Sequence, residues 1–92
     1  FCPLGPIIQT EFEENPELNI QCFVNDELRQ DGNTAEMIFS IGEILQFVTS
    51  IMTLLPGDVI LTGTPEGVGP IVPGDKVHAK IDTIGDLINP VE

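Results

Sequence analysis

The sequence predicts a mostly β fold of the α+β class with one amphipathic helix, because three local patterns occur along its 92 residues. Apolar and polar residues alternate over residues 18–24, as in a strand with one buried face. Apolar residues recur at helical spacing over residues 41–53. The tripeptide Pro-Gly-Asp occurs at residues 56–58 and 73–75, and a strand-like run containing Val follows each copy.

The first third of the chain is predicted to hold three strands. A β-branched run from Ile7 to Thr10 follows a turn fixed by proline, and the polar residues 11–17 then form an exposed loop. Asn25-Asp26 tolerates positive φ, so we expect it to join the strand at 18–24 to a hairpin partner at 27–31.

One helix is predicted over about residues 41–53. Ser40 and Glu43 have the spacing of a capping box, in which each side chain satisfies a free N–H group of the first turn. We interpret the apolar stripe that follows as a core face rather than a cofactor pocket. Its members are Ile41, Ile44, Leu45, Val48, Ile51 and Met52.

The two Pro-Gly-Asp copies are each predicted to form a type II turn, since Pro presets φ at the second position and Gly accepts positive φ at the third. Strands are expected after each turn, at 59–64 and 76–81, and again at 84–91. In the strand at 76–81, alternation places Lys76, His78 and Lys80 on one face. The total is about six strands and one helix.

The composition restricts the possible partners. Three Lys and Arg residues stand against fifteen Asp and Glu residues, and the net charge of -12 argues against nucleic acid or an anionic membrane surface as a partner. No apolar stretch approaches the ~18 residues of a membrane span. The spacing of Cys2 and Cys22 indicates neither a zinc site nor a disulfide framework, so we expect buried or free thiols in a reducing compartment, the cytoplasm. Because the chain has no starting Met, we expect it to be part of a longer protein.

The stretch VILTGT carries the main candidate site. Thr62 and Thr64 would point to the same face if the strand persists, and Gly63 between them would let a ligand approach the backbone. A threonine hydroxyl can donate to a carboxylate or carbonyl oxygen, and Gly67 and Gly69 would free the following loop to present N–H groups to an anion. The alternative is a well-specified corner between strand and loop, which uses the same residue types.

Other candidate sites find less support. GTPEGVG lacks the Lys-Ser/Thr that a P-loop requires, and no nucleophile elbow surrounds a serine. Glu11 and Glu13 form an ExE pair, but their polar, turn-rich surroundings favour a solvated loop. His78 is expected on the surface between two lysines.

Five stretches, taken in order, resemble the C-terminal half of the fumarylacetoacetate hydrolase family. They are FCPLGP at 1–6, RQDGNTAEMIF at 29–39, LLPGDVILTGTPEGVGP at 54–70, PGDKV at 73–77 and IGDLINPV at 84–91. The chain is most similar to the bacterial-type acylpyruvate hydrolases, oxaloacetate decarboxylases and 2-hydroxyhepta-2,4-diene-1,7-dioate isomerases. Residues 1–92 would then be the C-terminal portion of a single catalytic domain.

The resemblance implies a mixed β-sheet roll resembling a barrel, a homodimer, and an enzyme of aromatic or central carbon catabolism acting on 2-oxo acids such as acylpyruvates or oxaloacetate. It also implies a divalent cation, Mg, Mn or Ca, whose carboxylate ligands and catalytic Lys lie upstream of this chain. No catalytic or metal-binding residue is therefore expected here. Thr64 maps onto the family's substrate-binding threonine, with Gly63 allowing the approach. The competing hypothesis is a truncated, non-catalytic structural or dimerisation module.

Overall fold

The computed structural model describes residues 3–11 and 16–92, and it contains four strands, one α-helix and a short 3-10 helix. The strands are β1 (Asn19–Val24), β2 (Glu27–Asn33), β3 (Lys76–Ile81) and β4 (Gly85–Pro90). The helices are η1 (Thr34–Glu36) and α1 (Ile41–Ile51). The predicted mostly β fold with a single amphipathic helix is confirmed. Cys2, Glu13 and most of the predicted loop at 11–17 lie outside the described residues.

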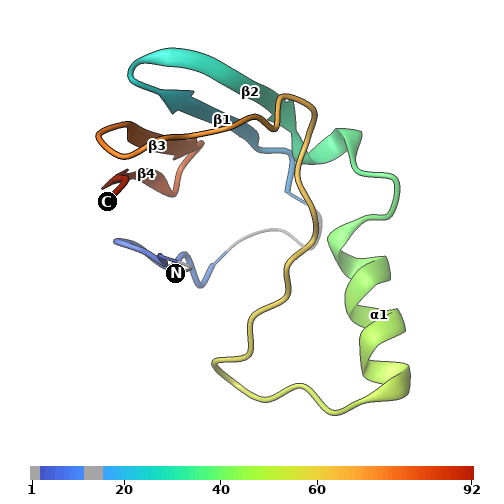
Figure 1. Ribbon diagram of the computed structural model, residues 1–92. Coiled ribbons are helices and arrows are strands. Elements are labelled where there is room, and N and C mark those ends of the chain that lie inside the picture. Colours follow the sequence, from blue (N-terminus) through green and yellow to red (C-terminus); the bar gives the residue numbers. More distant parts are fainter. Residues whose placement is uncertain (1–2, 12–15) are drawn as a thin grey trace.

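The four strands form one sheet in the order β2-β1-β3-β4 (Figure 1). All three pairings are antiparallel, with Ile20 opposite Ile81 in the central pair. The sheet of the described residues is open, whereas the family resemblance led us to expect a mixed, rolled sheet. The predicted hairpin turn is confirmed, because Asn25 and Asp26 both take positive φ, at 51° and 67°.

The two Pro-Gly-Asp turns have matching geometry. The N–H group of Asp58 donates to the carbonyl of Leu55 at 3.0 Å, and that of Asp75 donates to the carbonyl of Val72 at 3.1 Å. Gly57 and Gly74 take φ values of 94° and 97°, the positive φ that a type II turn requires at its third position. The turns are therefore formed as predicted from their local chemistry.

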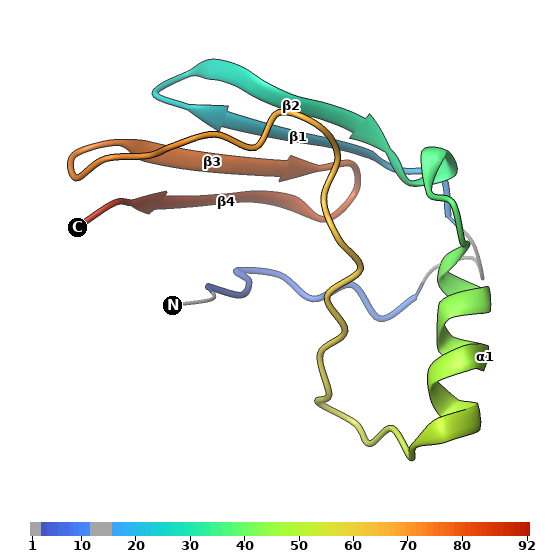
Figure 2. The ribbon, with the colours of Figure 1, turned by 45° about the vertical axis from the view of Figure 1, so that its right-hand side comes forward.

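Helix α1 begins with the predicted capping box. The N–H group of Glu43 donates to Ser40 Oγ at 3.1 Å, and the N–H group of Ser40 donates to Glu43 Oε1 at 3.3 Å. The helix ends at Ile51, slightly before the predicted limit of 53. It stands beside one end of the sheet, and none of its residues is buried, so the expected core stripe is not covered by the described residues (Figure 2). No helix among the described residues is long and apolar enough to cross a membrane.

Two predicted strands are not strands in the structure. Residues 7–10 and 59–64 have no ladder partner among the described residues. Residues 59–64 belong to the return segment, residues 52–75, which runs from the end of α1 back to the sheet. In the described part of the chain, no strand lies beside them there (Figure 1). A ladder needs a second chain segment for its hydrogen bonds, so a strand-like sequence alone does not make one. Val59 and Leu61 are accordingly exposed.

The apolar residues do not assemble into a core. Val24, at 6% exposure, is the one buried hydrophobic residue among those described. It lies at the end of β1, one of the two central strands of the sheet. The described sheet is thus a single layer that encloses no interior. The return segment lies against one of its strands, β2.

Candidate functional site

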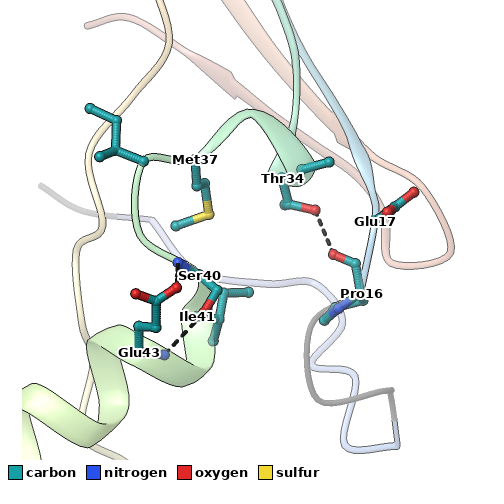
Figure 3. A pocket seen from close by; sticks show the side chains of 9 residues that line it. Pro16, Glu17, Thr34, Met37, Ser40, Ile41 and Glu43 are labelled. Carbon is teal, nitrogen blue, oxygen red and sulfur yellow. Dashed lines mark hydrogen bonds between the residues drawn. The ribbon is translucent and has the colours of Figure 1, made fainter.

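Two hollows of similar size lie on the surface of the described residues. The first, of about 250 Å³, lies between the start of α1 and η1 (Figure 3). Three of its polar side chains bond one another or nearby backbone: Thr34 Oγ1 donates to the carbonyl of Pro16 at 2.6 Å, and Ser40 and Glu43 form the capping box. The capping box forms the start of α1, and the bond of Thr34 joins η1 to Pro16, so we assign both a structural role.

The second hollow, of about 200 Å³, lies where the return segment crosses β2 and contains the candidate TGT residue Thr64. Its polar members are Arg29, Gln30 and Thr64, and most of the others are small or apolar. The lining is Cys22, Val24, Arg29, Gln30, Thr64, Gly67, Val68, Gly69, Ile71 and Val77. We take this hollow as the candidate site.

A β-bulge in β2 places two consecutive polar residues at this hollow. Cys22 of β1 is opposite Gln30, but the next residue, Phe23, is opposite Leu28, so Arg29 has no partner on β1. An extra residue of this kind bends the strand locally, and bulges occur often beside functional sites. Arg29 and Gln30 both line the hollow as a result.

Gln30 connects β2 directly to the TGTP segment. Its Nε2 donates to Thr64 Oγ1 at 2.8 Å and to the carbonyl oxygen of Pro65 at 2.9 Å. Sequence reasoning did not assign Gln30 a role. Its position in RQDGNTAEMIF, one of the stretches that carry the family resemblance, could have drawn attention to it. Its hydrogen-bond partner Thr64 is 34 residues away along the chain, however, so no local pattern connects the two.

Two glycines allow the return segment to lie close against β2. A Cβ at Gly32 would be 3.4 Å from Pro65 Cβ, and a Cβ at Gly67 would overlap the carbonyl oxygen of Arg29. Gly67 also has φ of 108°. The stretches RQDGN and TGTPEG therefore pack against each other, and Gly67 serves this contact. The predicted presentation of N–H groups to an anion stays a prediction.

Thr64 and Gly63 lie on the open side of this contact. Thr64 is exposed, and a Cβ added at Gly63 would meet no atom within 4 Å, although its φ of 101° would strain any other residue. The premise that a strand aligns Thr62 with Thr64 is wrong, because the segment has no ladder. Thr62 does not line the hollow described above. The ligand-binding roles of Thr64 and Gly63 stay predictions.

His78 lies on the sheet, on β3. It is half-buried rather than a surface residue as expected, with its ring centroid 5.6 Å from that of Phe23. Its Nε2 is buried and lies 3.2 Å from Asp86 Oδ2 without the alignment of a hydrogen bond. Lys76, from the same predicted cationic face, pairs with Asp26 at 3.3 Å.

The described residues do not form a metal site. Within residues 3–11 and 16–92, no group of three His, Cys, Asp or Glu side chains is placed to hold a metal ion. Glu11 is described, but its ExE partner Glu13 is not. We therefore assign no metal ligand in the described part of the chain.

Comparison with known proteins gives matches over the whole chain. The family profile described as "Fumarylacetoacetate (FAA) hydrolase C-terminal" matches residues 1–92. A mitochondrial oxaloacetate tautomerase of Oryza sativa subsp. japonica is 49% identical over 88 residues, which cover 95% of this chain and 38% of that protein.

Solved structures give the same result. The 2-hydroxyhepta-2,4-diene-1,7-dioate isomerase of Mycobacterium marinum is 48% identical, with a TM-score of 0.92 over 99% of this chain and 36% of that one. The maleylpyruvate hydrolase of Sphingobium sp. SYK-6, crystallised with manganese(II) and pyruvate, is 43% identical, with a TM-score of 0.92 over 99% of this chain and 35% of that one. The chain thus spans little more than a third of these relatives.

Proposed function

This chain belongs to the fumarylacetoacetate hydrolase family, and on that premise we propose that it supplies part of the substrate pocket of a metal-dependent enzyme acting on 2-oxo acids. Acylpyruvates and oxaloacetate are the proposed substrates, and the reaction is a hydrolysis, a decarboxylation or an isomerisation. The observation that carries the proposal is the placement of Thr64, an exposed residue that lines a hollow and whose hydroxyl oxygen accepts a hydrogen bond from Gln30 of β2.

The proposed role of Thr64 is to bind the carboxylate or oxo group of the substrate. A hydroxyl donates well to either oxygen, and hydrogen bonds to charged groups are stronger than those between neutral groups. Gly63 would let the substrate reach the backbone, since the space beside its α-carbon is open. The Sphingobium relative was crystallised with pyruvate, itself a 2-oxo acid, which supports this substrate class.

The charge of the chain requires a further component. Against fifteen acids it offers Arg29, which lines the hollow but lies 3.8 Å from Glu27, and two lysines of β3, Lys76 and Lys80. A divalent cation, Mg, Mn or Ca, would supply positive charge to an anionic substrate when bound. The manganese in the Sphingobium relative supports a divalent cation, and we propose that residues outside this chain hold it.

Three further statements complete the proposal. Residues 1–92 form the C-terminal portion of one catalytic domain, the protein is a homodimer, and it acts in the cytoplasm. The first is supported by the match of the whole chain to a C-terminal family profile and by its coverage of about a third of the solved relatives.

The test is the Thr64→Val substitution in the full-length protein. Turnover of acetylpyruvate and oxaloacetate is measured with Mn²⁺ and with Mg²⁺. Loss of a hydrogen bond to a charged group costs about 1.5–3 kcal/mol, so we expect roughly a 10- to 100-fold loss of kcat/KM. Thr53→Val is the matched control, because Thr53 is an exposed threonine of the same return segment that does not line the hollow.

Two outcomes contradict the proposal in different ways. Unchanged kinetics in Thr64→Val would leave Thr64 as a structural corner between two segments. Absence of turnover in the full-length protein with either metal would favour the alternative, a non-catalytic structural or dimerisation module.

A further inference from the structure

We propose that Gln30 is a positioning residue that fixes the hydroxyl of Thr64 as a hydrogen-bond donor toward the bound 2-oxo acid. The inference rests on the proposed function, because it assumes that Thr64 contacts the substrate. It adds a residue of β2 to the site and explains how the polarity of the hydroxyl is set before a substrate arrives.

The first step is the chemistry of the amide. Gln30 Nε2 carries two hydrogens and accepts no hydrogen bond. One hydrogen is directed at Thr64 Oγ1, 2.8 Å away, and the other at the carbonyl oxygen of Pro65, 2.9 Å away. Thr64 Oγ1 is therefore the acceptor of this bond, and its own proton must point to another partner.

The second step is what holds the amide in this orientation. Turning the amide over would bring Gln30 Oε1 against the carbonyl oxygen of Pro65, and two acceptors cannot bond each other. Pro65 presents only a carbonyl there, since proline has no N–H group. The Pro65 carbonyl thus selects the amide orientation, and the amide in turn selects the polarity of the Thr64 hydroxyl.

The third step is the rigidity of the contact. The β-bulge at Arg29 places Gln30 at the hollow, and the close approaches of Gly32 to Pro65 and of Gly67 to the Arg29 carbonyl hold the return segment on β2. A hydrogen bond between segments held by packing keeps its geometry at little entropic cost. The Thr64 oxygen is therefore held in place, and its proton is kept away from the direction of Gln30.

The consequence concerns the ligand. A hydroxyl whose lone pair already accepts from Gln30 has its proton available for a carboxylate or keto oxygen. It matches the oxygens of a 2-oxo acid, and only one of its two lone pairs remains for a donor at the same position. Gln30 thereby favours acceptors among the possible ligands without touching the ligand itself.

The experiment uses the full-length protein and a double-mutant cycle. Pyruvate is titrated calorimetrically in the presence of Mn²⁺ into wild type, Gln30→Met, Thr64→Val and the double variant. Methionine has similar length but no donor, so we expect Gln30→Met to weaken pyruvate binding about 3- to 10-fold. The double variant should bind no more weakly than Thr64→Val alone, because the amide acts only through the hydroxyl.

A second variant tests the polarity itself. In Gln30→Glu the introduced carboxylate would accept the Thr64 proton, and it would repel both the Pro65 carbonyl and the pyruvate carboxylate. We expect a larger loss of affinity than in Gln30→Met, whereas a merely space-filling role predicts similar losses. Gln21→Met is the matched control, because Gln21 lies on β1 with its amide 3.4 Å from Asp31, does not line the hollow, and should bind pyruvate like wild type.

The thermal midpoint of each metal-free variant shows that it folds. Wild-type affinity in Gln30→Met together with a weakened Thr64→Val would overturn this inference and leave the proposed function standing. Independent, additive losses in the double variant would also overturn it. If Thr64→Val binds pyruvate as well as wild type does, or wild type binds none, the proposed function itself fails.

Discussion

Asp75 shows how one carboxylate joins a turn to a distant hairpin. Its Oδ2 accepts from the N–H group of Val72 at 3.0 Å, and its Oδ1 accepts from Asn25 Nδ2 at 2.8 Å. The bond from the Val72 backbone, followed by that from Asn25, lowers the pKa of Asp75 from its ordinary value of 3.8. Asn25 also accepts from the N–H group of Lys76, so the turn before β3 is tied to the β1–β2 turn.

This shift predicts a pH dependence for Asp75→Asn in the full-length protein. A lowered pKa in the folded state means that the carboxylate stabilises the fold at pH above 3.8 and that this contribution is lost as pH falls through the folded pKa. The free energy of unfolding should therefore differ between wild type and variant at neutral pH and converge as the pH falls below the folded pKa of Asp75. Urea unfolding at a series of pH values measures it, and a constant difference would contradict the prediction.

At the scale of elements, the contact between the return segment and β2 is the feature that builds the site. It combines a bulge at Arg29, two glycines and the amide of Gln30, and each of these has its partner in the other segment. By contrast, hydrogen bonds between residues three or four positions apart cap both ends of α1. The site thus depends on the approach of two segments, whereas the helix depends on its own residues.

Gly67→Ala should separate these segments. The added Cβ would overlap the Arg29 carbonyl and would sit at a φ of 108°. Gly74→Ala is the matched control, with φ of 97° and open space around the added Cβ. Positive φ costs each variant about 1–3 kcal/mol, so the further loss in Gly67→Ala reports the contact with β2. We expect a lower thermal midpoint and weaker pyruvate binding for Gly67→Ala, and equal behaviour of the two variants would contradict the contact.

At the scale of the whole molecule, the described residues leave large apolar side chains uncovered. Ile8, Ile38 and Leu61 are 81%, 92% and 81% exposed. The radius of gyration is 14.5 Å, whereas a compact chain of this length has about 12 Å. A stable domain packs two layers of secondary structure around a core, and here the sheet has one layer.

A polypeptide of these 92 residues alone is therefore expected to lack a cooperative thermal transition and to bind the dye ANS. The full-length protein should unfold cooperatively and bind little dye, because the remainder of the proposed catalytic domain would cover the apolar side chains. Calorimetry and dye fluorescence on both proteins provide the measurement. A sharp transition of the short chain, with no dye binding, would show that these residues fold independently.

The elements that the sequence predicted correctly are those whose determinants lie within a few residues. The hairpin turn at Asn25-Asp26, both Pro-Gly-Asp turns and the capping box of Ser40 and Glu43 depend on local φ preferences and on hydrogen bonds between near neighbours. Thr64 could be singled out because a family motif surrounds it.

Only the tertiary structure decided which segments find partners. Residues 7–10 and 59–64 have strand-like sequences but no ladder among the described residues, and Gln30 bonds a threonine 34 positions away. Hydrogen bonds of this kind exist only when chain topology brings two segments together, and no local preference encodes that approach. The sequence by itself thus determined the turns, the helix and the candidate threonine, while the bulge at Arg29 and the amide of Gln30 became part of the site through packing alone.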